Sequence, residues 1–310
     1  MKLNLSPAPH VHTNQSTRTL MRNVLIALLP CAIAGVGFFG FNALMVLVVS
    51  TCSAVAAEYL WQAATRQKVR VGDLSAAVTG LILGLNLPAT APLWMVAIGS
   101  AFAVVIVKGL FGGLGDNFVN PALAARAMLL ASWPQYMTRW YAPAGLAAVD
   151  AVATATPLSN PGGFTTLQLI LGSIPGSVGE VCKIAILLGF AWMLYTKTIT
   201  WRIPVVMVVS TAVFSFAFGN DPLSAVLSGG LLFGAVFMAT DYATCPMTAV
   251  GQIVYAALAG LLVAVIRKFS DYPEGVTYAI LLMNVASPVI DHFITRRVYG
   301  HGKEAKNAQA

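Results

Sequence analysis

Long apolar runs, separated by short polar clusters, occupy almost the whole of this 310-residue chain. Hydrophobic residues make up 58% of the sequence and charged residues only 9%, far from the mixture that a water-soluble domain carries. A helix that crosses the hydrocarbon core of a bilayer needs about 20 residues, so up to about ten spans fit. The sequence therefore predicts an all-α integral membrane protein with almost no extramembrane domain.

The apolar runs predict ten transmembrane segments, at 23–40, 42–60, 74–88, 92–109, 121–136, 178–196, 203–219, 223–239, 249–266 and 276–293. The third segment ends at Pro88 and the fifth begins at Pro121, and both are short. Short segments bounded by proline indicate broken or re-entrant helices. At membrane depth the backbone groups that such breaks release must be satisfied by protein or by a ligand.

Basic residues between the runs predict the orientation of the chain. Four clusters fall on one side of a ten-span chain: Arg18 and Arg22; Arg66, Lys68 and Arg70; Lys197 and Arg202; and Arg296, Arg297, Lys303 and Lys306. Since basic loops stay in the cytoplasm, residues 1–22 and 294–310 are expected there, with the 137–177 loop on the outer side. Arg267 and Lys268 fall outside and break the rule. These clusters account for the net charge of +7, so nucleic-acid binding is not expected.

A short internal repeat suggests how the segments are grouped. Leu74-Ser75-Ala76 followed by Thr79-Gly80 recurs, 149 residues later (223 − 74), as Leu223-Ser224-Ala225 followed by Ser228-Gly229. We expect one membrane domain over residues 1–310, composed of a first repeat at 23–136 and a second at 178–293. Five segments per repeat is an odd number, so the second repeat would enter from the opposite side, as inverted repeats do in many transporters.

The four cysteines occur singly, without the local spacing of a zinc or iron–sulfur site. Their simplest interpretation is as small apolar side chains in helices. Cys31 and Cys182 fall in the first segment of each half, which leaves a metal site shared by two helices as the alternative.

A candidate attachment site lies in the 137–177 loop. Residues 150–158 read D-x-x-A-T-A-T-P-L, from Asp150 to Leu158. The string resembles the site at which a flavin transferase joins FMN, through its phosphate, to a threonine hydroxyl. An Ala/Thr-rich stretch before a proline is also typical of an ordinary loop.

Six other strings occur in order along the chain. They are 112–122 (GGLGDNFVNPA), 176–180 (GSVGE), 200–204 (TWRIP), 232–241 (LFGAVFMATD), 272–276 (YPEGV) and 298–301 (VYGH). Together with the loop motif they resemble the RnfD family, the D subunits of the Rnf complex, from Ser6-Pro7 to the C-terminus. The B subunits of the sodium-pumping NADH:quinone reductase form a related family.

The resemblance implies a component of an ion-translocating ferredoxin:NAD oxidoreductase in a bacterial inner membrane, with both termini cytoplasmic and the loop periplasmic. Such a component is part of a redox-driven translocase and not a complete enzyme alone. It would pass electrons through covalent FMN on Thr156, with Asp150 and Ala155 as parts of the attachment motif. Ala153 stands where the family often has serine or threonine, and Thr154 is the alternative acceptor.

The same resemblance implies further cofactors and partners. A second, non-covalent flavin such as riboflavin is one expectation, and flavin and iron–sulfur subunits, a flavin transferase and the lipid bilayer are the expected partners. Gly112-Gly113-Leu114-Gly115 lacks a preceding strand and a Gly-Lys-Ser/Thr ending, so it does not predict a phosphate-binding loop. The sequence contains no nicotinamide-binding fingerprint, and NAD would therefore bind elsewhere in the complex.

Four charged residues fall within or at the edges of the apolar runs, where an ionisable group is costly. Glu58 and Lys108 are interpreted as interfacial anchors at segment ends. Glu180 and Asp241 lie next to small residues or expected helix breaks, and are candidates for an ion path or a flavin contact. Two other functions stay open: a cofactor-free channel or transporter with inverted repeats, and a structural scaffold for other redox subunits.

Overall fold

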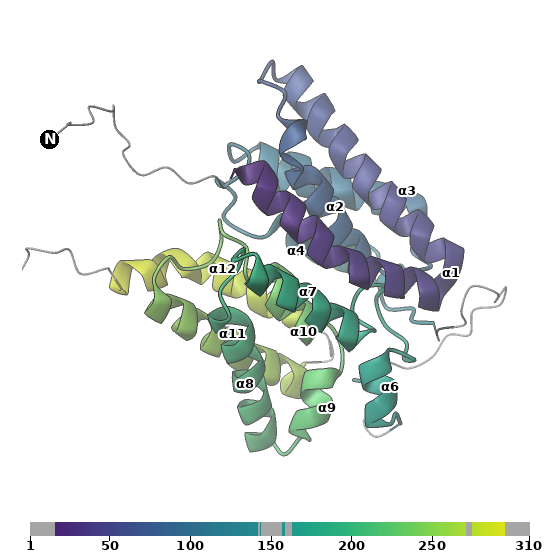
Figure 1. Cartoon of the computed structure of the whole chain (residues 1–310), viewed down its shortest axis with the longest axis vertical. Helices are drawn as coiled ribbons and strands as arrows, with labels where there is room; N and C mark the ends of the chain where they lie inside the picture. Colours follow the sequence, from purple (N-terminus) through teal and green to yellow (C-terminus); the bar gives the residue numbers. More distant parts are fainter. Residues whose placement is uncertain (1–15, 142, 144–156, 159–162, 271–274, 295–310) are drawn as a thin grey trace, which may run out of the picture.

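The computed structural model describes residues 16–141, 143, 157–158, 163–270 and 275–294. Every regular element among them is helical (Figure 1), which confirms the all-α class. The first half contains α1 (Thr17–Ala64), η1 (Val71–Asp73), α2 (Ser75–Leu85), α3 (Leu93–Ala101), η2 (Phe102–Gly109), α4 (Pro121–Ser132) and α5 (Pro134–Met137). The second contains α6 (Thr166–Leu171), α7 (Lys183–Tyr195), α8 (Arg202–Ala217), α9 (Pro222–Leu227), α10 (Leu231–Phe233), η3 (Gly234–Met238), α11 (Ala249–Phe269) and α12 (Val276–Phe293).

Helix length and composition mark this chain as a multi-pass membrane protein. Three of the described helices, α1, α11 and α12, are long and apolar enough to cross a bilayer. Shorter apolar helices cover Ser75–Leu85, Leu93–Gly109, Pro121–Ser132, Lys183–Tyr195 and Arg202–Ala217. The count of ten spans in two inverted repeats stays a prediction, because these shorter helices do not reach spanning length individually.

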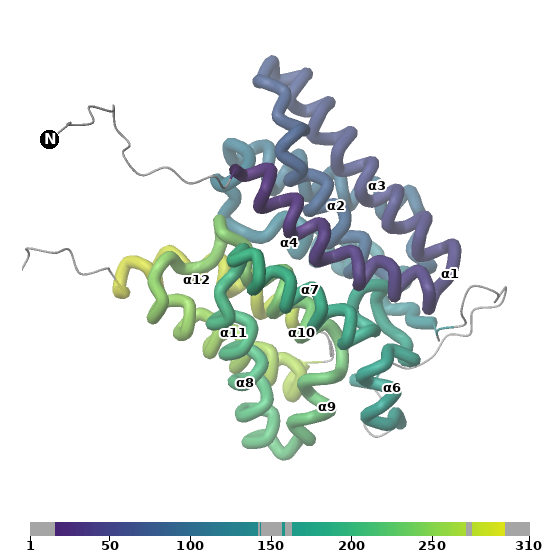
Figure 2. The backbone as a smooth tube through the Cα atoms, viewed as in Figure 1, coloured from purple at the N-terminus to yellow at the C-terminus, as the bar shows by residue number. Residues whose placement is uncertain are grey.

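α1 consists of two helical arms joined at Gly40. The backbone of Gly40 has φ 72° and ψ −153°, a conformation that glycine adopts without steric cost. The chain turns back on itself there, and the two arms diverge as a V (Figure 2). The boundary between the predicted segments 23–40 and 42–60 is therefore confirmed.

The segment predicted at 178–196 begins later than expected. Residues 178–182 are not helical, and α7 starts at Lys183. The amides of Val178 and Gly179 instead donate to the carbonyls of Leu87 (3.2 Å) and Leu85 (2.7 Å). The carbonyl of Leu85 lies at the end of α2 and that of Leu87 just beyond it, where the helix offers no further amide as a partner. This turn thus supplies partners for the broken helix that the sequence predicts near Pro88.

The segment predicted at 223–239 is interrupted, although the sequence pattern shows no break there. The structure divides it into α9, a break at 228–230, α10 and the π-helical η3. Gly229 has φ +64°, a left-handed conformation that ends the helix before it. A π-helix follows at Gly234–Met238, and such bulges are frequent at functional sites.

The two halves of the chain form two groups of helices that meet along one face (Figure 1). α1 packs on α2, α3 and α7, whereas α8, α11 and α12 pack together in the other group. α1 with α7 and α4 with α12 connect the groups. Close approach at the first of these contacts depends on Gly189 of α7: a Cβ there would meet the carbonyl oxygen of Ala27 and lie 2.7 Å from the Phe237 ring.

We expect Gly189→Ala to destabilise the folded protein by about 1–3 kcal/mol, because the added methyl group overpacks the α1–α7 contact. Gly37→Ala is the matched control, since a Cβ at Gly37 meets nothing within 4 Å. Thermal unfolding in detergent should show a lower midpoint for the first variant and no loss for the second. Equal midpoints would contradict the assigned packing.

Candidate functional site

A cavity of 470 Å³ lies beside the second half of the 137–177 loop. We call it the loop-side cavity; its wall comprises Pro157, Leu158, Phe164, Thr166, Leu169, Ser215, Gly219, Asn220, Asp221, Leu223, Ser224, Ala225, Ser228 and Arg267. Asp150, Ala155 and Thr156 of the attachment motif lie outside the described residues. Pro157 and Leu158, which directly follow Thr156 in sequence, are therefore the part of the motif that the structure places.

Leu158 packs against the helix break between α9 and α10. A Cβ on Gly229 would lie 2.6 Å from Cδ1 of Leu158, so only glycine leaves room for this contact. The same position is 3.4 Å from a terminal nitrogen of Arg267. The end of the motif, the break and the guanidinium thus meet at one point.

Arg267 belongs to the last turn of α11 and reaches back across the cavity wall to α9. Its Nη1 donates to the carbonyl of Ala225 (2.5 Å) and its Nη2 to the carbonyl of Ser228 (3.1 Å), both at the C-terminal end of α9. Helix C-termini attract cations. This placement gives a structural reason for an arginine on the side where the charge rule expects none.

The other charged residue in this wall is Asp221, which caps α9. Its carboxylate accepts a hydrogen bond from the backbone amide of Ser224 (2.8 Å). This hydrogen bond lowers the pKa of the Asp221 carboxyl, which therefore stays ionised at neutral pH.

Glu180 lies behind the same helix break. One carboxylate oxygen accepts from the amide of Ser177 (3.0 Å), and the other is buried without a hydrogen-bond partner among the described residues. Gly176 and Gly230 flank it, since a Cβ on either would lie 2.9 and 2.7 Å from its oxygens. The structure thus confines the carboxylate between two backbone stretches.

Lys183 is buried at the start of α7 and is a residue that the sequence interpretation missed. Its ammonium group donates to the carbonyl of Glu180 and, at 3.4 Å, to that of Gly229. A lysine inside the apolar run 178–196 was the available signal. Lys183 and Arg267 both approach the break at Gly229, from two different helices.

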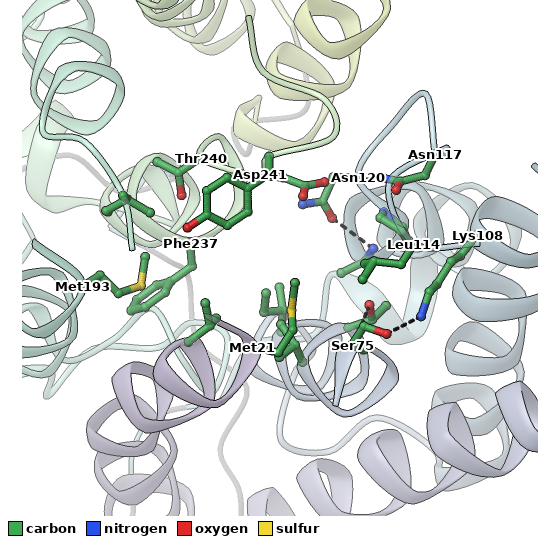
Figure 3. A pocket seen from close by; sticks show the side chains of 18 residues that line it. Met21, Ser75, Lys108, Leu114, Asn117, Asn120, Met193, Phe237, Thr240 and Asp241 are labelled. Atoms are coloured by element: carbon green, nitrogen blue, oxygen red, sulfur yellow. Dashed lines mark hydrogen bonds between the residues drawn. The ribbon is translucent and has the colours of Figure 1, made fainter. Parts of the chain in front are cut away.

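Asp241 occupies a different place, in a small cavity between the two groups of helices (Figure 3). This central cavity, of 90 Å³, is lined by Met21, Val24, Ser75, Val78, Thr79, Ile82, Lys108, Leu114, Asn117, Asn120, Pro121, Ala122, Met193, Ile199, Phe237, Thr240, Asp241 and Tyr242. The Asn117 amide approaches the Asp241 carboxylate at 3.4 Å. Apolar side chains cover one part of the wall and polar side chains converge on the other, as in a typical small-molecule site.

Asn120 connects two elements in the wall of the central cavity. Its side-chain oxygen accepts from the amides of Ala122 (3.0 Å) and Leu123 (3.2 Å) and so caps α4, while its amide nitrogen donates to the carbonyl of Met238 (3.3 Å). The Asn-Pro-Ala stretch is therefore a helix cap that also ties α4 to the end of η3.

Glu180 and Asp241 are not brought together. Glu180 lies just before the first residue of α7. Tyr242, the neighbour of Asp241 in sequence, donates to the carbonyl of Thr198, which lies just after the last residue of α7. A helix of 13 residues is about 20 Å long. The two candidate residues thus belong to separate sites at opposite ends of α7.

Glu58 and Lys108 form a buried ion pair, with 2.5 Å between Nζ and Oε1 and side-chain exposures of 5% and 4%. Lys108 also donates to the hydroxyl of Ser75 (2.5 Å), which in turn donates to Asp73 (2.5 Å). The interpretation of Glu58 and Lys108 as interfacial anchors is therefore wrong. Each of the two residues is the other's partner inside the bundle, so neither charge is buried alone.

A second buried charge that the sequence interpretation missed lies in α4. The guanidinium of Arg126 donates to Asn86 and to Thr277, both at 3.3 Å, and so connects the break after α2 with α12. An arginine in the apolar run 121–136 was the signal. Such a residue in a membrane helix commonly faces the interior of the bundle, as Arg126 does.

Cys31 and Cys182, the two cysteines of the alternative metal site, both lie at the main core. Cys31 is buried in the main core, Cys182 packs against that core, and both are free thiols. Among the residues that the structure describes, no three histidine, cysteine or acidic side chains gather as metal ligands would.

Known proteins match this chain over almost its whole length. The model of the NQR2, RnfD, RnfE family matches residues 4–300. The chain belongs to this family. It is 46% identical, over 100% of its length and 99% of the relative's, to the D subunit of the Na(+)-translocating ferredoxin:NAD(+) oxidoreductase complex of Acetobacterium woodii. It is also 42% identical, over 93% of each chain, to the D subunit of the proton-translocating ferredoxin:NAD(+) oxidoreductase complex of Clostridium ljungdahlii.

A third relative is less similar in sequence but also matches over nearly the whole length. The D subunit of the ion-translocating oxidoreductase complex of Citrobacter koseri is 36% identical over 97% of this chain and 100% of its own. The comparisons thus confirm the family membership that the motifs predict. The names of the first two relatives state different ions, so membership of this family does not specify the ion.

We expect Glu58→Gln and Lys108→Met each to destabilise the fold by about 3–5 kcal/mol, because each leaves an uncompensated buried charge. The double variant Glu58→Gln/Lys108→Met should lose much less than the sum of the two. A double-mutant cycle on thermal unfolding in detergent measures the coupling. Additive losses would show that the pair does not act as a unit.

Proposed function

We propose that this chain is the D subunit of an ion-translocating ferredoxin:NAD oxidoreductase complex of the Rnf type. It carries electrons within the bacterial inner membrane as part of a redox-driven translocase. Similarity over nearly the whole chain to two D subunits of ferredoxin:NAD(+) oxidoreductase complexes, and to the D subunit of an ion-translocating oxidoreductase complex, supports this proposal. Its partners are then the other membrane and peripheral subunits of the complex.

FMN joined through its phosphate to Thr156 is the proposed carrier. The observation that carries this proposal is the D-x-x-A-T-A-T-P-L string in a member of this family, ending beside a 470 Å³ cavity. That volume is typical of cavities that hold small organic ligands. A phosphoester leaves the isoalloxazine ring free to accept and release electrons, while the protein determines where the ring lies.

The proposed arrangement in the membrane is two inverted repeats of five segments, with the Thr156 loop periplasmic and both termini cytoplasmic. Support comes from the four basic clusters and from the repeated string, which lies at the start of α2 in the first half and at the start of α9 in the second. Asp150 and Ala155 then belong to the sequence that a flavin transferase recognises.

The central cavity is the proposed place for a second, non-covalent flavin. Asn117, Asn120 and Asp241 offer hydrogen-bond partners for the polar edge of a flavin ring, and Phe237 and Met193 offer an apolar wall. At 90 Å³ the cavity is smaller than the ~300 Å³ of a usual organic-ligand site, so the side chains around it must move to admit a ring.

A cofactor-free channel or transporter is the alternative. Broken helices and buried ionisable residues such as Glu180 and Lys183 occur in such proteins as well. A scaffold without its own cofactor would likewise need no flavin. Both alternatives predict that the purified chain carries no covalent flavin.

Thr156→Ala should abolish covalent flavin, whereas Thr154→Ala, the matched control two residues away, should keep it. Each chain would be co-expressed with the other subunits and a flavin transferase, then measured by intact mass and by in-gel fluorescence after denaturation. The wild type should gain the mass of FMN less one water. A wild type without this gain would exclude the covalent-carrier function.

Asp241→Asn should reduce the flavin that acid denaturation releases from the complex, because the ring loses a charged partner. Asp116→Asn is the control, since Asp116 is exposed and does not line the central cavity. Chromatography of the released flavin measures the occupancy. The same release from Asp241→Asn as from wild type would contradict this placement.

A further inference from the structure

We propose that the helix break between α9 and α10 forms a binding site for one small monovalent cation, and that the ammonium group of Lys183 competes for this site. Its ligands are the carboxylate and the carbonyl of Glu180, the hydroxyl of Ser177 and the carbonyl of Gly229. The inference deepens the proposed function, since an ion-translocating complex needs cation sites, and it rests on that function only for the purpose of the site.

Two buried oxygen atoms beside the break have no hydrogen-bond partner among the described residues. They are Oε2 of Glu180 and Oγ of Ser177, and the two residues are 4% and 0% exposed. The backbone amide of Ser177 donates to the other carboxylate oxygen of Glu180 (3.0 Å), so the two residues are held together. A buried carboxylate oxygen without a partner is costly. A bound cation would remove this cost.

Lys183 shows that the same place accepts a positive charge. Its side chain is buried, and its ammonium group donates to the carbonyls of Glu180 and, at 3.4 Å, of Gly229. Within the described part of the chain, no carboxylate lies at ion-pair distance from this ammonium group. Backbone carbonyls released by a broken membrane helix are typical ligands of Na⁺. The ammonium group of Lys183 therefore occupies a position that suits an inorganic cation.

The carboxylate and the ammonium group approach consecutive residues of the break. A Cβ on Gly230 would lie 2.7 Å from Oε2 of Glu180, whereas the carbonyl that binds Lys183 belongs to Gly229. A side chain at Gly230 would fill the space next to the carboxylate, so glycine keeps this approach open. Oxygen atoms of a carboxylate, a hydroxyl and the backbone thus meet at one short stretch of chain.

The charges around the break explain why a cation and the ammonium group would exclude each other. Glu180 brings one negative charge, whereas Lys183 and Arg267 each bring a positive one. Arg267 donates to two carbonyls of the α9 end, and Lys183 to that of Gly229. A further cation beside the carboxylate would be repelled by the ammonium group. The flexible stem of lysine lets that group withdraw, so Lys183 acts as a tethered competitor.

Lys183→Met should strengthen Na⁺ binding by about tenfold, because the variant removes the competing hydrogen-bonded charge. A lysine with only a structural role would leave the affinity unchanged or weaken it. The measurement is thermal unfolding of the full-length chain in detergent at rising NaCl, with choline chloride keeping the ionic strength constant. The dissociation constant follows from the rise of the midpoint with Na⁺ concentration.

Lys268→Gln is the matched control, because it removes a positive charge from an exposed residue of the same region. Its dissociation constant should equal that of the wild type, whereas Glu180→Gln should abolish the stabilisation by Na⁺. Equal constants in Lys183→Met and wild type would overturn the proposal. Equal midpoints in NaCl and choline chloride for Lys183→Met would overturn it as well.

Ser177→Ala is the second test, for the case that Lys183→Met fails to fold. Loss of a hydroxyl without a partner costs little stability, so this variant should unfold like the wild type in choline chloride but gain less from Na⁺. Equal stabilisation of both by Na⁺, or of neither, would then overturn the proposal. These measurements do not involve flavin, and the mass measurement on Thr156→Ala does not involve the break. Failure of one proposal therefore leaves the other unaffected.

Discussion

Backbone amides and carbonyls that leave a helix at membrane depth must find partners, because the hydrocarbon offers none. This requirement explains the main irregularities of the chain. The end of α2 is completed by the amides of Val178 and Gly179 from the other half. The break after α9 is completed by the side chains of Lys183 and Arg267. Both breaks are thus satisfied from distant parts of the sequence, and the first of them joins the two halves.

The proposed functional residues follow from the same constraint. Cations that satisfy broken helices become fixed positive charges on rigid elements, and such charges suit an anionic or reducible ligand. Arg267 and Lys183 have this position beside the loop-side cavity, whereas Asn117, Asn120 and Asp241 surround the central cavity. Lys183 lies at the first residue of α7, whereas Met193, in the wall of the central cavity, lies near its last.

The buried charges show which parts of the site were accessible from sequence. Glu180 and Asp241 were predicted because glycines and expected breaks adjoin them, and the structure buries Glu180 and places Asp241 in the wall of the central cavity. Their functional roles stay predictions. Lys183 and Arg126 were missed, although each stands out as a charge within an apolar run. Glu58 and Lys108 were misinterpreted because they are each other's partner and stand 50 residues apart in the chain.

Composition and the apolar runs determined by themselves that this chain is an all-helical membrane protein, since apolar runs of about 20 residues have the length of a spanning helix, which bonds its own backbone groups in lipid. Seven short strings were sufficient to predict its family. Tertiary structure alone decided that 223–239 is broken, that α7 starts at Lys183, and that Leu158, Gly229 and Arg267 meet at one point. The physical reason is that these outcomes depend on contacts between distant helices, which the local pattern of residues does not encode.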